Sequence, residues 1–150
     1  MITARKPLLA TIAKIRITKP ISDIAEIRIR AGREAALVDV HGETSYCSEP
    51  FSAEEIAEVF AEICRYSVYS FQGEIAQGYV TLDGGNRVGI CGTAVYKNGK
   101  IDFIKDISGL NIRIAHEKIG CADELFERFF REGARSLILG GKPLSGKTTL

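Results

Sequence analysis

The C-terminal end of the chain carries residues whose types and spacing suit them to bind the phosphates of a nucleotide. The segment Gly141-Lys142-Pro143-Leu144-Ser145-Gly146-Lys147-Thr148 has the form G-x-x-x-x-G-K-[ST]. Glycines in such a loop let backbone N–H groups approach phosphate oxygens, and a helix beginning at Gly146 would point its positive end at the same anion. Lys147 would neutralise the β and γ phosphates, while the Thr148 hydroxyl would hold Mg²⁺. The predicted nucleotide-binding residues are Gly141, Gly146, Lys147, Thr148 and Thr149.

The same segment has two features that argue against nucleotide binding by this chain alone. Only Thr149 and Leu150 follow the motif, and a helix needs several turns to be stable by itself. Leu144 stands where most such loops have glycine, and a bulky side chain there resists the backbone turn. We therefore expect an incomplete loop with no catalytic residue and no tightly bound nucleotide. Thr148 would hold Mg²⁺ only in an intact ATPase, and no other metal site is expected.

Five arginines form a second candidate site, one for contact with another molecule. Arg28 and Arg30 alternate with isoleucines and therefore share one face of a predicted strand, and Arg33 follows in the next turn. Two interpretations are open for them: a solvated outer face, or a contact with a neighbouring subunit or partner. Arg87 and Arg113 are candidates for structural ion pairs, or for an arginine that approaches nucleotide phosphates from another domain.

The cysteines and histidines do not form a recognisable metal or catalytic site. The four cysteines are widely spaced, with no C-x-x-C pair, and the two histidines lie far apart in the sequence. Zinc sites and nucleophile–base pairs need such residues clustered. We interpret the cysteines as mostly buried thiols in a reducing compartment.

Composition excludes several classes of protein. The chain has 150 residues, 45% of them hydrophobic and 26% charged, with a formal net charge of +1. This is typical of a soluble globular protein and gives no bulk electrostatic case for binding nucleic acid or an anionic membrane. No apolar run is long enough to span a membrane, and the N-terminus does not resemble a signal peptide. A cytoplasmic protein is predicted; a nucleic-acid-binding module using the arginine strand is kept as an alternative.

The first half of the chain predicts a small α+β arrangement. Apolar residues at helical spacing indicate a helix over residues 7–17, followed by a short turn near residues 21–25. Alternating residues predict strands over 26–30 and 36–40 and a third near Ser45, which together form an antiparallel meander.

Two helices should follow this meander. Ser52 and Glu55 have the spacing of a capping box, and the helix that they begin should run to about Cys64. A further helix is expected over residues 68–77, ending at Gly78.

The middle of the chain predicts further strands. These are expected over residues 79–82, 88–96, 101–104 and 111–114. Residues 83–86 should form a tight turn, and Asn98-Gly99 suits a type I′ hairpin turn.

The C-terminal residues predict a different architecture. An amphipathic helix is expected over residues 121–131, and the apolar run at residues 136–139 predicts a buried parallel strand. The predicted fold class is therefore α+β, with small antiparallel sheets and helices, followed by the first helix and strand of an α/β P-loop domain. We place an N-terminal domain at residues 1–119 and the truncated start of a P-loop ATPase domain at 120–150.

Five separated segments, in this order, strongly resemble the N-terminal half of the stage III sporulation protein AA family. The resemblance runs from about residue 23 to residue 150. Two positions in the phosphate-binding loop depart from the family, because Lys142 and Leu144 replace its usual proline and glycine. The segments are Glu26-Ile27-Arg28-Ile29-Arg30-Ala31-Gly32-Arg33, Tyr66-Ser67-Val68-Tyr69-Ser70-Phe71, Gly78-Tyr79-Val80-Thr81-Leu82-Asp83-Gly84-Gly85-Asn86-Arg87-Val88-Gly89, Asp106-Ile107-Ser108-Gly109-Leu110-Asn111-Ile112-Arg113-Ile114-Ala115 and Gly120-Cys121-Ala122-Asp123.

This resemblance implies a cytoplasmic ATPase, peripheral to the forespore membrane, that uses ATP and Mg²⁺ and serves the channel between mother cell and forespore. It also implies sporulation channel proteins and other ATPase subunits as partners, without nucleic acid and without membrane insertion. For this chain we expect a non-catalytic assembly and interaction domain, monomeric or weakly dimeric. The alternative is a nucleotide-binding ATPase whose remaining core is missing from the chain.

Overall fold

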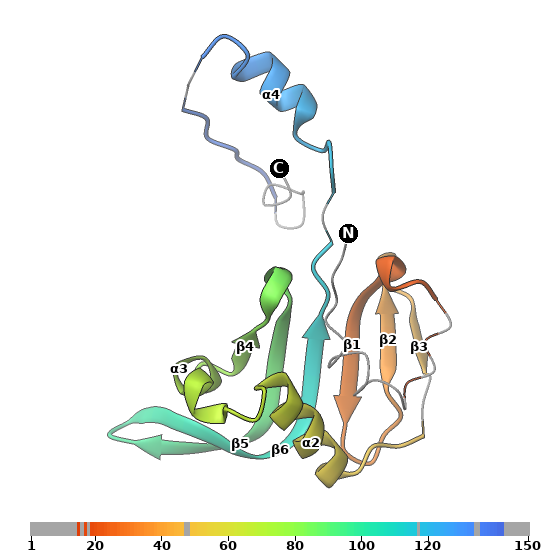
Figure 1. The fold of residues 1–150 in the computed structure, drawn as a ribbon, viewed down its shortest axis with the longest axis vertical. Helices are drawn as coiled ribbons and strands as arrows, with labels where there is room; N and C mark the ends of the chain where they lie inside the picture. Colours follow the sequence, from red (N-terminus) through yellow and green to blue (C-terminus); the bar gives the residue numbers. More distant parts are fainter. Residues whose placement is uncertain are drawn as a thin grey trace. The chain divides into compact units, whose positions relative to one another are not determined.

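A computed structural model describes residues 15, 17, 19–46, 49–116, 118–133 and 136–142 (Figure 1). Contacts divide the chain into two compact units, Met1–Ala115 and His116–Leu150. The division falls slightly before the boundary expected at residues 119 and 120, and the domain assignment stays a prediction. Most of the helix predicted over residues 7–17 and the loop from Pro143 to Leu150 lie outside the described residues.

The first unit contains one six-stranded antiparallel sheet with the order β3-β2-β1-β6-β5-β4. The predicted meander is confirmed as β1, β2 and β3. The expectation of several small sheets is wrong, because β6 pairs with β1 on one side and with β5 on the other (Figure 1). The strands are β1 (Ile24–Arg30), β2 (Ala36–Asp39), β3 (Thr44–Tyr46), β4 (Tyr79–Thr81), β5 (Arg87–Lys97) and β6 (Lys100–Arg113).

Strand β6 runs without interruption through the region where two separate strands were expected. The pairing of β5 with β6 shifts register between Cys91 and Thr93, and Asp106 on β6 has a φ of 49°. A β-bulge of this kind bends a strand and increases its twist, but pairing resumes on the far side. The predicted hairpin turn is confirmed, since Asn98 and Gly99 have φ values of 52° and 76°.

Helix α2 (Ala53–Ile63) begins as the sequence predicts. The Glu55 backbone N–H donates to Ser52 Oγ at 3.2 Å, and the Ser52 N–H donates to Glu55 Oε2 at 2.7 Å. These reciprocal bonds satisfy amides that the first turn of a helix leaves unpaired.

The second predicted helix is shorter than expected. Residues Val68–Phe71 form the 3₁₀-helix η3, and α3 covers only Gln72–Ile75. The segment opens with β-branched and aromatic residues and contains Gly73, all of them weak helix formers. Gly78 follows with a φ of 87°. Two further 3₁₀-helices, η2 (Ile21–Asp23) and η4 (Asp83–Gly85), form the turns expected near these positions.

The core lies between one face of the sheet and helices α2 and α3. In Figure 1, α2 crosses this face over β6, and α3 lies beside β4. Alternate residues of the strands point into the core, as strand geometry requires. Its buried side chains include Ile27, Ile29, Leu37, Ile56, Val59, Phe60, Ile63, Ile75, Val80, Val88, Leu110 and Ile112.

The second unit contains α4 (Asp123–Phe129), in which no residue is buried. The rings of Phe126 and Phe130 stack with centroids 6.1 Å apart. The buried strand predicted over residues 136–139 is wrong: these residues form no strand, and Ile138 is 96% exposed. A parallel strand requires a neighbouring strand to pair with, and no strand in the described part of the chain pairs with this segment. Among the described residues, no helix is both long and apolar enough to cross a membrane.

Candidate functional site

The predicted nucleotide-binding loop lies mostly outside the described residues. Gly141 is described and lies in an exposed segment without regular structure, whereas Gly146, Lys147, Thr148 and Thr149 are not described. Nucleotide binding at this loop therefore stays a prediction.

The sheet brings four of the five candidate arginines onto one face. Arg87 on β5 lies directly opposite Arg113 on β6, and Arg113 lies opposite Glu26 on β1. Arg28 and Arg30 follow Glu26 at alternate positions of β1, so they share its face. The intervening residues of these strands are buried in the core on the other side. We call this surface the arginine face; its residues are Glu26, Arg28, Arg30, Tyr79, Arg87, Gly89, Cys91, Gly109, Asn111 and Arg113.

Arg30 has a structural role within the arginine face. Its Nη1 donates to the carbonyl oxygens of Ile29 at 2.7 Å and Leu110 at 3.0 Å, and its Nη2 donates to Asn111 Oδ1 at 2.6 Å. The side chain lies across Gly109, where an added Cβ would come within 2.6 Å of Arg30 Cδ. Arg30 thus fastens β1 to β6, and its hydrogen bonds leave it little capacity for a partner molecule.

Arg28 is paired but exposed. Its Nη2 lies 3.1 Å from Glu26 Oε2, and 46% of the side chain is exposed. The hydrogen bond and charge of Glu26 raise the pKa of Arg28. Such an exposed pair contributes little to stability and can be exchanged for a partner carboxylate.

Arg87 and Arg113 form a cross-strand pair of like charges, and both side chains are exposed. Like charges at directly opposed positions of an antiparallel ladder destabilise it. The Arg87 guanidinium lies over the Tyr79 ring, 4.5 Å from its centroid. This contact holds the Arg87 side chain against the arginine face. Two guanidinium groups placed side by side can bind one anion together, because each supplies a planar set of donors.

Arg33 is the exception among the five. It is exposed in the turn after β1, where its backbone N–H donates to the Arg30 carbonyl oxygen. It does not lie opposite any residue of β2 or β6 in the strand pairing of β1. The structure therefore does not group Arg33 with the arginine face.

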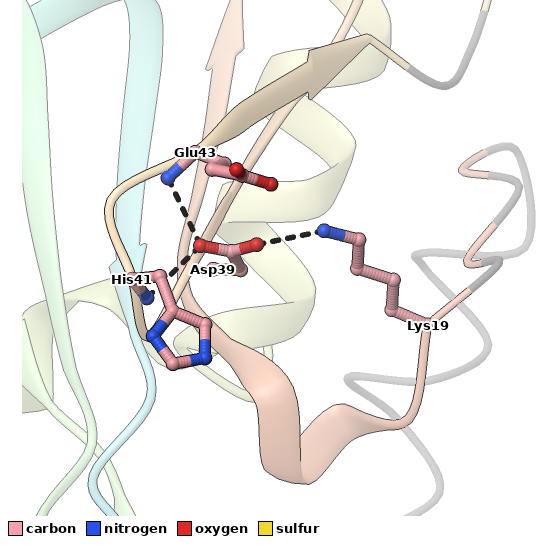
Figure 2. A network of polar contacts seen from close by, with 4 residues as sticks. All are labelled: Lys19, Asp39, His41 and Glu43. Atoms are coloured by element: carbon pink, nitrogen blue, oxygen red, sulfur yellow. Dashed lines mark hydrogen bonds and ion pairs between the residues drawn. The ribbon is translucent and has the colours of Figure 1, made fainter.

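A polar cluster that sequence reasoning missed is centred on Asp39 at the end of β2 (Figure 2). Asp39 Oδ2 accepts a hydrogen bond from Lys19 Nζ at 2.7 Å. Its Oδ1 accepts from the backbone N–H groups of His41 at 3.0 Å and Glu43 at 2.9 Å. Asp39 is only 7% exposed, and these donors, Lys19 first, lower its pKa from 3.8 to about 2. His41 takes part through its backbone alone, so the cluster fixes the turn between β2 and β3.

Of the cysteines that the structure describes, Cys64 is buried whereas Cys91 and Cys121 are exposed, so the expectation of mostly buried thiols is wrong. Cys64 is fully buried, and burial raises its pKa from 9.0 to about 11, which keeps it protonated. No group of histidines, cysteines and carboxylates suited to a metal ion occurs in the part of the chain that the structure describes.

Comparison with known proteins identifies the family. The model of the family described as "Sporulation stage III, protein AA" matches residues 5–150. Stage III sporulation protein AA of Bacillus subtilis (strain 168) is 36% identical over 128 residues, which make up 85% of this chain and 41% of the relative. Among solved structures, the VirB11 ATPase of the Brucella suis type IV secretion system, in complex with sulphate, aligns with 91% of this chain and 40% of its own. Its sequence identity is 16% and its TM-score 0.47. The extent of the family match shows that the chain belongs to the stage III sporulation protein AA family.

Proposed function

We propose that this chain is the assembly and interaction domain of a stage III sporulation protein AA-like ATPase, one that serves the channel between mother cell and forespore. The observation that carries the proposal is the asymmetry of the sheet. One face is packed into the core, while the other is solvent-accessible and carries four arginines against one glutamate. Exposed arginines and tyrosines are enriched where proteins contact one another.

The proposal places the domain at the cytoplasmic side of the forespore membrane, with channel proteins and other ATPase subunits as its partners. It assigns ATP and Mg²⁺ to the intact ATPase of the family and no hydrolysis to this chain. The chain matches 41% of its Bacillus subtilis relative, so the activity of the whole protein is itself part of the proposal.

A chimera tests the proposed role. Residues 5–115 of this chain would replace the corresponding residues of the Bacillus subtilis protein in a strain that lacks its own copy. We expect heat-resistant spores, and fewer when the chimera carries Arg87→Glu and Arg113→Glu. A stably accumulated chimera that yields no spores would contradict the proposal.

Nucleotide binding by this chain is the second candidate function, favoured by the G-x-x-x-x-G-K-[ST] segment. Calorimetric titration of the purified chain with MgATP separates the two. The proposed function predicts neither heat of binding at micromolar nucleotide nor phosphate release, whereas saturable binding that Lys147→Ala removes would support the second candidate.

A further inference from the structure

We infer that the arginine face of one copy of this chain binds the exposed, glutamate-bearing side of α2 on a second copy, so that the chains associate head to tail. This inference rests on the proposed function, since it identifies one partner of the assembly domain. It follows from the opposite charges that the two sides of the first unit carry.

The outer side of α2 is acidic. Its exposed glutamates are Glu54 and Glu58, which lie one turn apart, and the helix contains no lysine, arginine or histidine. Glu55 is held in the capping box, and Glu62 is only partly exposed, with one carboxylate oxygen buried. Hydrogen bonds from its own backbone amide and from Ser52 lower the pKa of Glu54, which keeps this carboxylate ionised.

Two alanines make this side of α2 accessible to a flat partner. Ala57, which is exposed, and Ala61, which is partly exposed, lie beside Glu54 and Glu58 on the helix surface, whereas Ile56, Val59, Phe60 and Ile63 point into the core. Small residues allow the backbone of another element to approach closely, so a sheet face can lie against the helix.

The spacing of the two sets of charges is similar. Glutamates one turn apart are separated by about 6 Å along the helix axis. Arginines on adjacent strands, such as Arg113 and Arg87, are about 5 Å apart across the sheet. Neighbouring carboxylates of α2 can therefore meet neighbouring guanidinium groups of the arginine face.

These two surfaces cannot satisfy each other within one copy. Helix α2 packs on the core side of the sheet, and the arginine face is the opposite side of the same sheet. A contact between them joins different patches on two copies, which is a heterologous contact. Both surfaces also contain like-charge neighbours, Arg87 with Arg113 and Glu54 with Glu58, whose repulsion the contact would relieve.

A second copy suits the arginine face better than nucleic acid does. Glu26 lies between Arg28 and Arg113 on the face, so the face is not continuously basic as a surface that tracks a phosphate backbone would be. The formal net charge of the chain is only +1, so the long-range attraction that supports nucleic-acid binding is weak.

Sedimentation velocity of the full chain over a concentration series tests the inference. At about 0.05 M salt we expect the average mass to rise with protein concentration, and at about 0.5 M salt to return to that of a monomer. Arg113→Glu and Glu58→Lys should each weaken self-association at least about tenfold. An equimolar mixture of the two variants should restore it, because each reversed surface then meets an oppositely charged one. Lys100→Glu, which makes an equal change of charge at the exposed hairpin tip, is the matched control. It should self-associate to the same extent as the unmodified chain.

Thermal unfolding of each variant shows whether it is folded. If a charge-reversal variant is not folded, the neutral variants Arg113→Gln and Glu58→Gln are used in its place. The inference is overturned if the unmodified chain stays monomeric at low salt or if the charge reversals leave the average mass unchanged. It is also overturned if mixing the folded variants does not restore self-association. Loss of single-stranded DNA binding by Arg113→Glu without a change in mass would also overturn it and assign the face to nucleic acid. If the chain stays monomeric while the chimera forms spores, this inference fails and the proposed function stands.

Discussion

The two faces of the sheet differ in what their side chains contribute, although they alternate along the same strands. On β6, Ile112 is fully buried while Arg113 next to it is exposed. The core face excludes water and supplies most of the stability of the unit. The arginine face instead places Arg87 and Arg113 side by side, a pairing of like charges that weakens the free protein slightly. The contrast shows that neighbouring residues of one strand differ sharply in what they contribute to stability, and under our proposal the exposed ones serve recognition.

The largest effect should come from the core face. Ile112→Ala removes a fully buried side chain from the central strand and leaves a cavity, so we expect a loss of about 2–5 kcal/mol in the free energy of unfolding. Urea denaturation followed by circular dichroism measures this loss. A change below about 1 kcal/mol would show that the core face is less tightly packed than the structure indicates.

A smaller but clear effect is expected from a glycine of the arginine face. In Gly109→Ala, the new Cβ would meet Arg30 Cδ at 2.6 Å and the Ile29 carbonyl oxygen at 2.9 Å. Displacing Arg30 and the backbone should reduce the free energy of unfolding by about 1–3 kcal/mol. Gly89→Ala is the control on the same face, because its Cβ would lie at an ordinary 3.6 Å from Asn111 Cβ. Equal denaturation midpoints for the two variants would argue against the structural role of Arg30.

Acid should weaken the unit through Asp39, the last residue of β2. The folded-state pKa of Asp39 is about 2, below its ordinary value of 3.8. Its contribution is therefore complete above about pH 5 and is lost as the pH falls from about 4 towards 2. Asp39→Asn should lower the melting temperature at pH 7 and make it less dependent on pH between 4 and 2. Parallel melting curves for both proteins across that range would contradict this prediction.

The smallest effect on stability should come from the arginine face itself. Arg113→Ala removes an exposed side chain together with the repulsion from Arg87, so the free energy of unfolding should change by no more than about 0.5 kcal/mol. Together with Ile112→Ala, this variant compares adjacent residues that point to opposite faces. A loss of more than about 1 kcal/mol would assign Arg113 to structure and not to binding.

Local sequence signals predicted the elements whose determinants lie close together in the chain. The capping box of Ser52 and Glu55 located the start of α2, and the apolar side of that helix is buried as its spacing indicated. The alternation of Arg28 and Arg30 with isoleucines correctly placed both arginines on one face. The pair Asn98-Gly99 located the hairpin turn.

Features that depend on distant residues could not be predicted in this way. Nothing near Arg87 indicates that Arg113 will lie opposite it, because the pairing depends on the register of two strands across a bulge. The Asp39 cluster joins Lys19 to a turn 20 residues away. The apolar run at residues 136–139 predicted a strand, yet an isolated apolar run specifies neither a partner nor a burial site.

The central position of β6 also determines when the sheet can form during synthesis. Arg30 and Asn111, which hydrogen-bond across β1 and β6, are 81 residues apart in the chain. At a translation rate of about 5–20 residues per second, β1 waits roughly 4–16 s before its partner strand exists. During that interval the nascent chain exposes the edge of β1 and its isoleucines, and pairings over such long separations form slowly. The β1–β6 ladder is therefore a late step in the folding of the growing chain.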